Sequence, residues 1–252
     1  MLHHWGTITA GAVAMFSRLG VTAEMVAGII HGHATSRPRN RQKQIGPSGI
    51  GTPCTRRIGY QLLDVDQVNF SDPLAAWIGT AAHASMEAAL ADDKDWETEI
   101  PVTFPGYPIR GTADAYSASL STVVDWKFVA PTSLRKYAAN GPGEQYRTQA
   151  HMYGCGLNHS GRAVDTVAIA FIPRSGLLSG IHVWSEPYDD QVVEAALERY
   201  DLVGAVTTSG LSVLPQLGTK DAYCDWCPYF NPNSTDLTAA CSGHKPPAAA
   251  GS

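Results

Sequence analysis

Apolar residues recur along this chain with two periods, one helical and one alternating, and the change of period divides it into parts. Residues 8–34 carry apolar side chains at helical spacing, which predicts two short helices with Thr22 as an N-cap. A polar linker rich in Pro and Gly is expected over residues 35–53, followed by helices at 54–66 and 73–91. The alternating period begins after these helices.

The middle of the chain predicts a sheet. Stretches rich in Val, Ile, Thr and aromatic residues, separated by short turn sequences, predict three consecutive strands at 97–104, 108–116 and 122–129. The elements expected next are a helix at 142–157, strands at 164–172 and 181–185, and a helix at 187–206. This order predicts an α/β (mixed α+β) fold with a central mixed sheet flanked by helices.

The length and net charge of the chain restrict its domain organisation and the class of protein further. The 252 residues suit helices and a linker over 1–53, a single domain over 54–244 with its core at about 73–206, and a disordered tail over 245–252. Eighteen Lys and Arg against 23 Asp and Glu give a net charge of −5, which excludes a polybasic protein but not a local basic groove. The linker cations Arg37, Arg39, Arg41 and Lys43 suit either phosphate binding or a solvated loop.

The ends and the cysteines indicate a compartment. The N-terminus lacks the pattern of a signal peptide, so we expect the cytoplasm of a bacterial or phage-infected cell, and no membrane. Disulfides are rare there, so the five cysteines need another explanation. Cys155 follows a helical pattern and is expected in the core. The other four are Cys54, far upstream, and Cys224, Cys227 and Cys241 near the C-terminus.

One predicted strand carries a carboxylate and an ammonium group on the same face. Because side chains alternate, Asp125 and Lys127 point the same way, and an antiparallel hairpin would bring Asp114 close to Asp125. Two such carboxylates repel unless a divalent cation neutralises them, and oxygen ligands suit Mg²⁺ or Mn²⁺. A neighbouring lysine can position water or offset charge on a phosphate, which favours phosphodiester hydrolysis. An exposed edge strand with an ordinary ion pair is the alternative.

Together these residues resemble the motif of the PD-(D/E)xK nuclease superfamily. The match is Gly111-x-x-Asp114, a short turn, and then two hydrophobic residues followed by Asp125-x-Lys127. The resemblance implies a restriction-endonuclease-like core in which Asp114, Asp125 and Lys127 are catalytic. It also implies that the two aspartates hold one or two metal ions, joined by the backbone carbonyl of Trp126.

Further features resemble the RecB-type branch of that superfamily. The G-x-x-x-H of this branch is matched by Gly79-Thr-Ala-Ala-His83, which implies that His83 reaches the metal; an ordinary helix histidine is the alternative. Its Q-x-x-x-Y is matched by Gln149 and Tyr153, which share a helix face and would contact DNA or brace the lysine. Similar proteins often have an acidic residue in the first strand. Glu99 is the candidate here, although Glu97 also qualifies.

The cysteine layout resembles one RecB-type subgroup, which includes CRISPR-associated nucleases, phage exonucleases and AddB-type helicase–nuclease subunits. One cysteine before the core and three after it, here Cys54, Cys224, Cys227 and Cys241, imply a 4Fe–4S cluster. The 13 residues between Cys227 and Cys241 exceed the usual gap. Alternatively, the three C-terminal cysteines and His244 would hold a structural Zn²⁺.

The expected function is a Mg²⁺- or Mn²⁺-dependent DNA nuclease, in first place an exonuclease, acting in recombination, repair or CRISPR-like processing. Arg56 and Arg57, with the linker cations, would guide the DNA strand. Recombination or CRISPR-adaptation proteins and further copies of the chain are candidate partners. A non-catalytic DNA-binding or complex-assembly module with a structural zinc or iron–sulfur site is the alternative.

Overall fold

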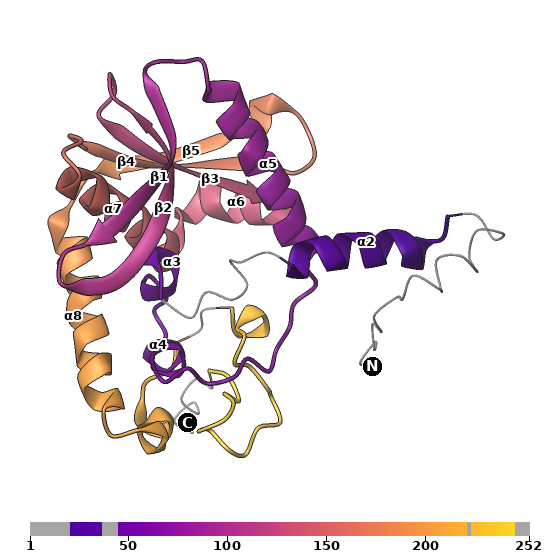
Figure 1. Cartoon of the computed structure of the whole chain (residues 1–252), viewed down its shortest axis with the longest axis vertical. Helices are drawn as coiled ribbons and strands as arrows, with labels where there is room; N and C mark the ends of the chain where they lie inside the picture. Colours follow the sequence, from indigo (N-terminus) through magenta and orange to yellow (C-terminus); the bar gives the residue numbers. More distant parts are fainter. Residues whose placement is uncertain (1–20, 37–44, 221–222, 245–252) are drawn as a thin grey trace, which may run out of the picture. The chain divides into compact units, whose positions relative to one another are not determined.

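The computed structural model describes residues 21–36, 45–220 and 223–244, shown in colour in Figure 1. The predicted basic linker segment and the predicted tail therefore lie outside the described residues. The chain divides into two compact units, one of residues 1–42 and 72–81 and the other of residues 43–71 and 82–252.

The first unit contains helix α2 (Ala23–Thr35) and the start of helix α5 (Leu74–Leu90). The predicted N-cap is confirmed, because the Thr22 side chain accepts a hydrogen bond from the Met25 amide. The indole Nε1 of Trp77 donates to Nδ1 of His33 at 3.0 Å, which joins the two helices within this unit. None of the helices in the described part of the chain combines the length and the apolar character needed to cross a membrane.

The second unit is built on a five-stranded mixed sheet with the order β1-β2-β3-β4-β5 (Figure 1). The strands are β1 (Trp96–Phe104), β2 (Tyr107–Ser117), β3 (Thr122–Val129), β4 (Thr166–Pro173) and β5 (His182–Pro187). Neighbouring strands are antiparallel except β3 and β4, which are parallel. A parallel pair needs a long crossover, and helices α6 (Pro131–Asn140) and α7 (Gly143–His159) supply it. The predicted mixed sheet flanked by helices is confirmed.

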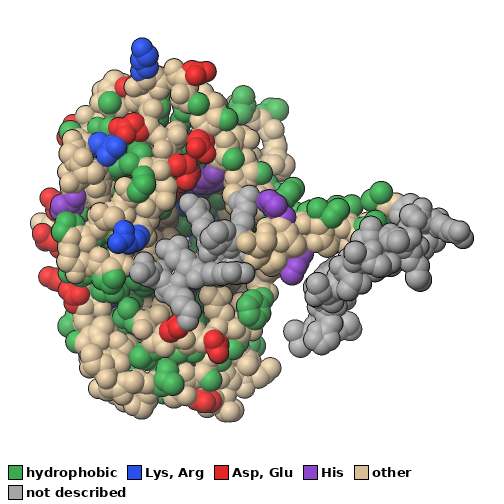
Figure 2. All heavy atoms as spheres, in the orientation of Figure 1, with side chains coloured by type: hydrophobic (Ala, Val, Ile, Leu, Met, Phe, Trp, Pro, Cys, Tyr) green, Lys and Arg blue, Asp and Glu red, His purple; other side chains and the backbone are tan. Residues whose placement is uncertain are grey.

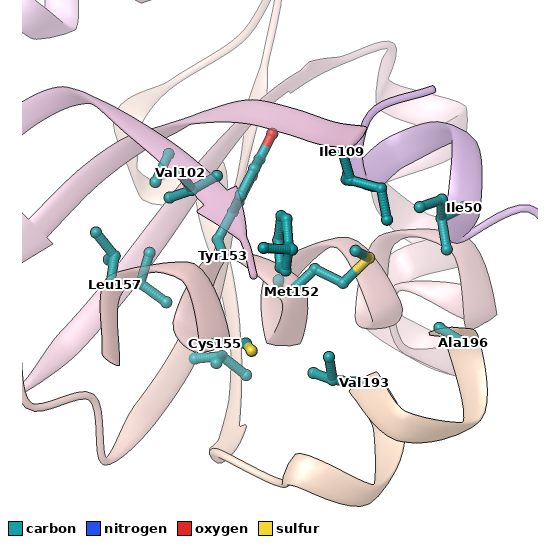
Figure 3. Close-up of a cluster of buried hydrophobic side chains, with 14 of the residues drawn as sticks. Ile50, Val102, Ile109, Met152, Tyr153, Cys155, Leu157, Val193 and Ala196 are labelled. Carbon is teal, nitrogen blue, oxygen red and sulfur yellow. The ribbon is translucent and has the colours of Figure 1, made fainter. Parts of the chain in front are cut away.

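The core lies where α7 packs against the sheet and against helix α8 (Asp190–Thr207) (Figure 3). Met152 and Leu157 of α7 are fully buried, and Cys155 is buried beside them, as its pattern predicted. Two glycines of α7 permit this close packing. A Cβ on Gly156 would lie 2.6 Å from Cβ of Val102, so any larger residue would push α7 off the sheet.

Two helices of this unit were not predicted. Residues 45–53 were assigned to a polar linker, but they contain the short helix α3 (Pro47–Ile50), and Ile50 is fully buried. Four residues make barely one turn, too few to show a period. Helix α6 was missed because few of its side chains face inward, and Tyr137 is its one buried residue.

The C-terminal segment closes on helix α4 (Thr55–Leu62), which begins at its N-cap Cys54. This segment contains the short 3₁₀ turns η3 (Leu211–Gln216) and η4 (Cys224–Trp226), and another 3₁₀ turn, η2 (Leu178–Gly180), joins β4 to β5. The ring of Tyr60 stacks on Tyr229 at 5.0 Å, and its hydroxyl donates to the carbonyl of Leu237 at 2.5 Å. A segment with little periodicity is thus attached to the core by specific side-chain contacts.

Candidate active site

The β2–β3 hairpin brings the predicted catalytic residues together. Ala115 of β2 pairs with Val124 of β3 in the antiparallel register. Asp114 and Asp125 each lie one residue beyond this pair, so they lie opposite each other on the two strands. Oδ2 of Asp114 accepts a hydrogen bond from the Trp126 amide at 2.8 Å. The hairpin expected from the sequence is therefore present, and it places two carboxylates on neighbouring strands at the same level of the sheet.

Asp125 and Lys127 form a buried ion pair. Nζ of Lys127 lies 2.6 Å from Oδ2 of Asp125, and only 2% of the aspartate is exposed. The alternative of an exposed edge strand is wrong, because β3 is the central strand of the sheet. Burial raises the pKa of Asp125 to about 6, against the opposing effect of the lysine. Burial disfavours the charged form of Lys127, but the Asp125 carboxylate outweighs it and raises the pKa of the lysine.

A second group of potential ligands lies beside this pair. Single ligand atoms of His83, Glu99 and Asp114 all lie within 4.8 Å of one another. Nδ1 of His83 is 3.4 Å from Oδ1 of Asp114, and hydrogen bonding to this aspartate raises the pKa of the histidine. Figure 2 shows acidic side chains beside a histidine on one face, where the few Lys and Arg side chains are scattered. We refer to His83, Glu99, Asp114, Asp125 and Lys127 as the carboxylate site.

The backbone favours Glu99 over Glu97 as the acidic residue of the first strand. Thr98 pairs with Ala115 and Ile100 with Ala113, so Glu99 lies opposite Asp114. Its φ is 48°, a left-handed conformation that costs a non-glycine residue about 1 kcal/mol or more. Glu97 instead forms an ion pair with Arg162 at 2.7 Å. The two glutamates that the alternating pattern could not distinguish therefore have different roles.

The donor set fits a divalent cation. Two carboxylates and an imidazole offer oxygen and nitrogen ligands, which suit Mn²⁺ and, through the oxygens, Mg²⁺. Carboxylates held this close repel each other, and a bound cation would remove that repulsion.

Gln149 and Tyr153 of α7 are buried next to the carboxylate site. They are 6% and 7% exposed. Nε2 of Gln149 donates to Oδ1 of Asp125 at 3.3 Å and to the Tyr153 hydroxyl at 2.9 Å. Figure 3 shows this hydroxyl directed away from the apolar cluster. Gln149 and Tyr153 are thus linked to Asp125, the ion-pair partner of Lys127, and their predicted contact with DNA or bracing of the lysine stays a prediction.

Tyr146 was not predicted as a site residue, although its helical spacing from Gln149 and Tyr153 could have identified it. The Lys127 ammonium lies over its ring, 4.9 Å from the centroid. Such a cation–π contact favours the charged lysine. Tyr146, Gln149 and Tyr153 are spaced i, i+3 and i+7, so one stripe of α7 faces the buried ion pair.

Four cysteines line one pocket, which we call the cysteine pocket. Cys54, Cys224, Cys227 and Cys241 line it, together with residues that include Arg57, Tyr60 and His244. All four are free thiols, and burial raises the pKa of Cys227. The fold thus gathers one cysteine from before the sheet and three from after it, as the resemblance implied.

The thiols of the cysteine pocket are candidate ligands for a structural Zn²⁺ as well as for a cluster. Tetrahedral Zn²⁺ with Zn–S bonds of about 2.3 Å holds its sulfurs about 3.8 Å apart. Within the described ranges, the group of His83, Glu99 and Asp114 alone has three such ligand atoms mutually within 4.8 Å. No three of the four thiols therefore lie mutually within 4.8 Å. His244 hydrogen-bonds through its ring to Thr219 at 3.3 Å and lies in the same pocket.

Arg56 and Arg57 lie at this pocket. Arg56 donates to the carbonyls of Leu217 and Pro215, at 3.2 and 2.8 Å, and approaches the sulfur of Cys241 at 3.9 Å. These contacts attach α4 to the C-terminal segment. Their predicted role in guiding DNA stays a prediction.

Comparisons with known proteins address the fold. No protein-family model matches the chain, and no curated protein matches its sequence. The crystal structure of SSO0001 is similar, with a TM-score of 0.51 and 18% identity, over 84% of this chain and 95% of that one. An alkaline exonuclease (LHK-Exo) from Laribacter hongkongensis gives a TM-score of 0.50 at 10% identity, over 71% of this chain and 94% of the exonuclease. The chain therefore has a fold that is also found in a solved exonuclease.

Proposed function

We propose that this protein is a metal-dependent DNA nuclease, most simply an exonuclease, that hydrolyses phosphodiester bonds. The observation that carries the proposal is the placement of three potential ligands, His83, Glu99 and Asp114, within 4.8 Å of one another beside the buried Asp125–Lys127 pair. The fold shared with an alkaline exonuclease supports it.

Each residue has a distinct task in the proposed mechanism. Asp114, His83 and Glu99, with Asp125 and the Trp126 carbonyl, would hold one or two Mg²⁺ or Mn²⁺ ions. A bound ion would lower the pKa of a water molecule and offset phosphate charge. Lys127 then orients the attacking water or stabilises charge on the scissile phosphate.

Lys127 needs to stay in place for this task. The Asp125 carboxylate lies 2.6 Å from its ammonium group, which also lies over the Tyr146 ring, 4.9 Å from the centroid. Gln149 fixes the carboxylate of Asp125 in turn. The lysine is thus preorganised by residues that need not touch the substrate.

The cysteine pocket would hold a 4Fe–4S cluster with a structural task. Its support is the gathering of four free thiols in one pocket, one from before the sheet and three from after it. Bound iron with absorbance near 400 nm would agree with this assignment, whereas one zinc per chain would favour the zinc alternative. We further propose that Arg56 and Arg57 guide DNA, and that the reaction belongs to recombination, repair or CRISPR-like processing.

Digestion of end-labelled DNA tests the nuclease directly. Single- and double-stranded DNA, labelled at the 5′ or 3′ end, is incubated with wild type, Asp125→Asn and Lys127→Ala in Mg²⁺, Mn²⁺ or EDTA. Each variant should lose at least about a thousandfold in rate with its circular dichroism unchanged. Lys94→Ala, at an exposed lysine, is the matched control and should cut normally.

Two results would contradict the proposal. A Lys127→Ala variant that cuts at the wild-type rate would show that the site is assigned to the wrong residues. A wild-type protein that binds DNA but cuts none of these substrates in any metal would favour the non-catalytic module instead.

A further inference from the structure

Three aromatic side chains are unusually exposed. Phe70, Trp226 and Tyr223 are 80%, 66% and 52% exposed, and within the part of the chain that the structure describes no other Phe, Tyr or Trp is mostly exposed. The remaining exposed large hydrophobic residues there are aliphatic. Aromatic rings carry a large apolar surface, so their exposure in water needs an explanation.

Backbone contacts fix the segments that carry these rings against each other. The amide nitrogen of Asn69 donates to the Pro228 carbonyl at 2.9 Å. Its side-chain amide donates to the carbonyls of Asp225 and Cys227, at 2.9 and 3.0 Å. The residue next to Phe70 is therefore bound to the turn that contains Trp226, and this turn is held between Cys224 and Cys227.

A cation accompanies the aromatic surface. Nζ of Lys136 lies 4.6 Å from the centroid of the Tyr223 ring and donates to its hydroxyl at 2.5 Å. Arg135, the preceding residue of α6, is exposed and has no ion pair with another described residue. A ring face next to fixed positive charge suits a ligand that combines flat bases with phosphates.

A chain of side chains leads from this surface to the carboxylate site. The Tyr137 ring lies 5.7 Å from that of Tyr146. Burial, together with the neighbouring Tyr146 and Tyr223, raises the pKa of Tyr137, so all three side chains lie close together. Tyr146 in turn contacts the Lys127 ammonium. Tyr137 and Tyr146 thus link Tyr223 to Lys127.

We propose that Tyr223 and Trp226, with Phe70, form a base-stacking site for single-stranded DNA that leads to or from the carboxylate site. The proposal rests on the proposed function and adds a substrate class to it. Base–aromatic stacking binds every base and needs no sequence readout, while Lys136 and Arg135 neutralise the backbone. A protein partner would also bury aromatic rings, but it would not explain the adjoining cations and their connection to Lys127.

Binding without cleavage tests this site. The probes are a fluorescein-labelled 12-mer of thymidylate and an abasic strand of the same length, titrated by anisotropy in Ca²⁺. Trp226→Ala and Tyr223→Ala should each weaken binding of the thymidylate strand about tenfold and leave the abasic strand nearly unchanged, because only bases stack. Lys136→Ala should weaken both strands.

Conservative and remote variants serve as controls. Trp226→Phe keeps a stacking ring and should retain most of the affinity, which separates stacking from damage to the cysteine pocket. Leu202→Ala removes an exposed side chain from α8, 68% exposed, and should have no effect. Iron and zinc content and circular dichroism are measured for every variant.

The outcomes are separable from those of the nuclease assay. Equal loss of the two strands in Trp226→Ala, or none in either ring variant, would overturn the stacking site even if the wild type cuts DNA. Loss of self-association in sedimentation with unchanged DNA affinity would overturn it in favour of a protein interface. Ring-dependent binding by a wild type that cuts nothing would support the stacking site and reject only the nuclease.

Discussion

The carboxylate site and the cysteine pocket belong to the same unit of the chain, but they are assembled from different kinds of contact. The carboxylate site lies on the regular ladder of β1, β2 and β3, where Glu99, Asp114 and Asp125 fall within 27 residues. The cysteine pocket joins Cys54 to residues 170 positions later, through a segment with little regular structure. The first is held mainly by the sheet, with His83 added from α5, and the second by side-chain contacts between α4 and the C-terminal segment.

The carboxylate site and the cysteine pocket also differ in how the protein balances the charge of their potential ligands. In the carboxylate site, the protein supplies its own counter-charge, since Lys127 pairs with Asp125 and His83 lies against Asp114. In the cysteine pocket, burial raises the pKa of Cys227, so its surroundings in the protein alone disfavour the thiolate form that a metal requires at this residue. The geometry of the carboxylate site should therefore not depend on the proposed metal, whereas that of the cysteine pocket should depend on the proposed cluster.

The largest expected effect comes from removing a thiol of the cysteine pocket. Cys227→Ser should lose the bound iron or zinc and lower the free energy of unfolding by about 3 kcal/mol, or the melting midpoint by about 10 °C. Cys155→Ser, in the core, should cost about 1 kcal/mol and keep the metal. Calorimetry and metal analysis measure both, and a Cys227→Ser variant with wild-type midpoint and metal would remove the distinction between the two regions.

A smaller effect is expected from replacing either of the two glutamates of β1, Glu99 and Glu97. Glu99→Gly should lower nuclease activity by at least about tenfold but leave stability nearly unchanged, because glycine tolerates the positive φ. Glu97→Gly should keep the activity and cost about 1 kcal/mol, since a glycine weakens the strand and the Arg162 contact is lost. Cleavage rates and melting midpoints are compared, and loss of activity in Glu97→Gly alone would reverse the assignment.

The smallest effect is a change in the pKa of His83. The hydrogen bond to Asp114 raises this pKa above 6.5, so in metal-free protein the contact stabilises the fold below pH 6.5, and the stabilisation is lost as the pH rises through the raised value. Asp114→Asn should lower the pKa, because burial then acts without the neighbouring carboxylate. NMR titration of the ring measures it, with Asp201→Asn as the control, and an unchanged pKa in Asp114→Asn would contradict the contact.

Regular periods made part of this molecule predictable. The strands at 97–104, 108–116 and 122–129 were expected within a few residues of β1, β2 and β3, because their alternation is strong and their turns are short. Helix α6 was not expected, since its inward-facing positions are too few to form a stripe. The left-handed conformation of Glu99 could not be predicted from the alternating pattern, because a non-glycine residue inside a strand rarely has a positive φ.

By itself, the sequence determined which chemical groups share a face. Two-residue alternation puts Asp125 and Lys127 on one side of β3, and a short hairpin brings Asp114 opposite Asp125 whatever surrounds them. Only the tertiary structure decided that the Asp125–Lys127 pair is buried in a central strand, that Tyr146 lies against the lysine, and that Cys54 joins the C-terminal cysteines. The reason is physical: face and register follow from local backbone geometry, whereas burial and distant contacts depend on how the whole core packs.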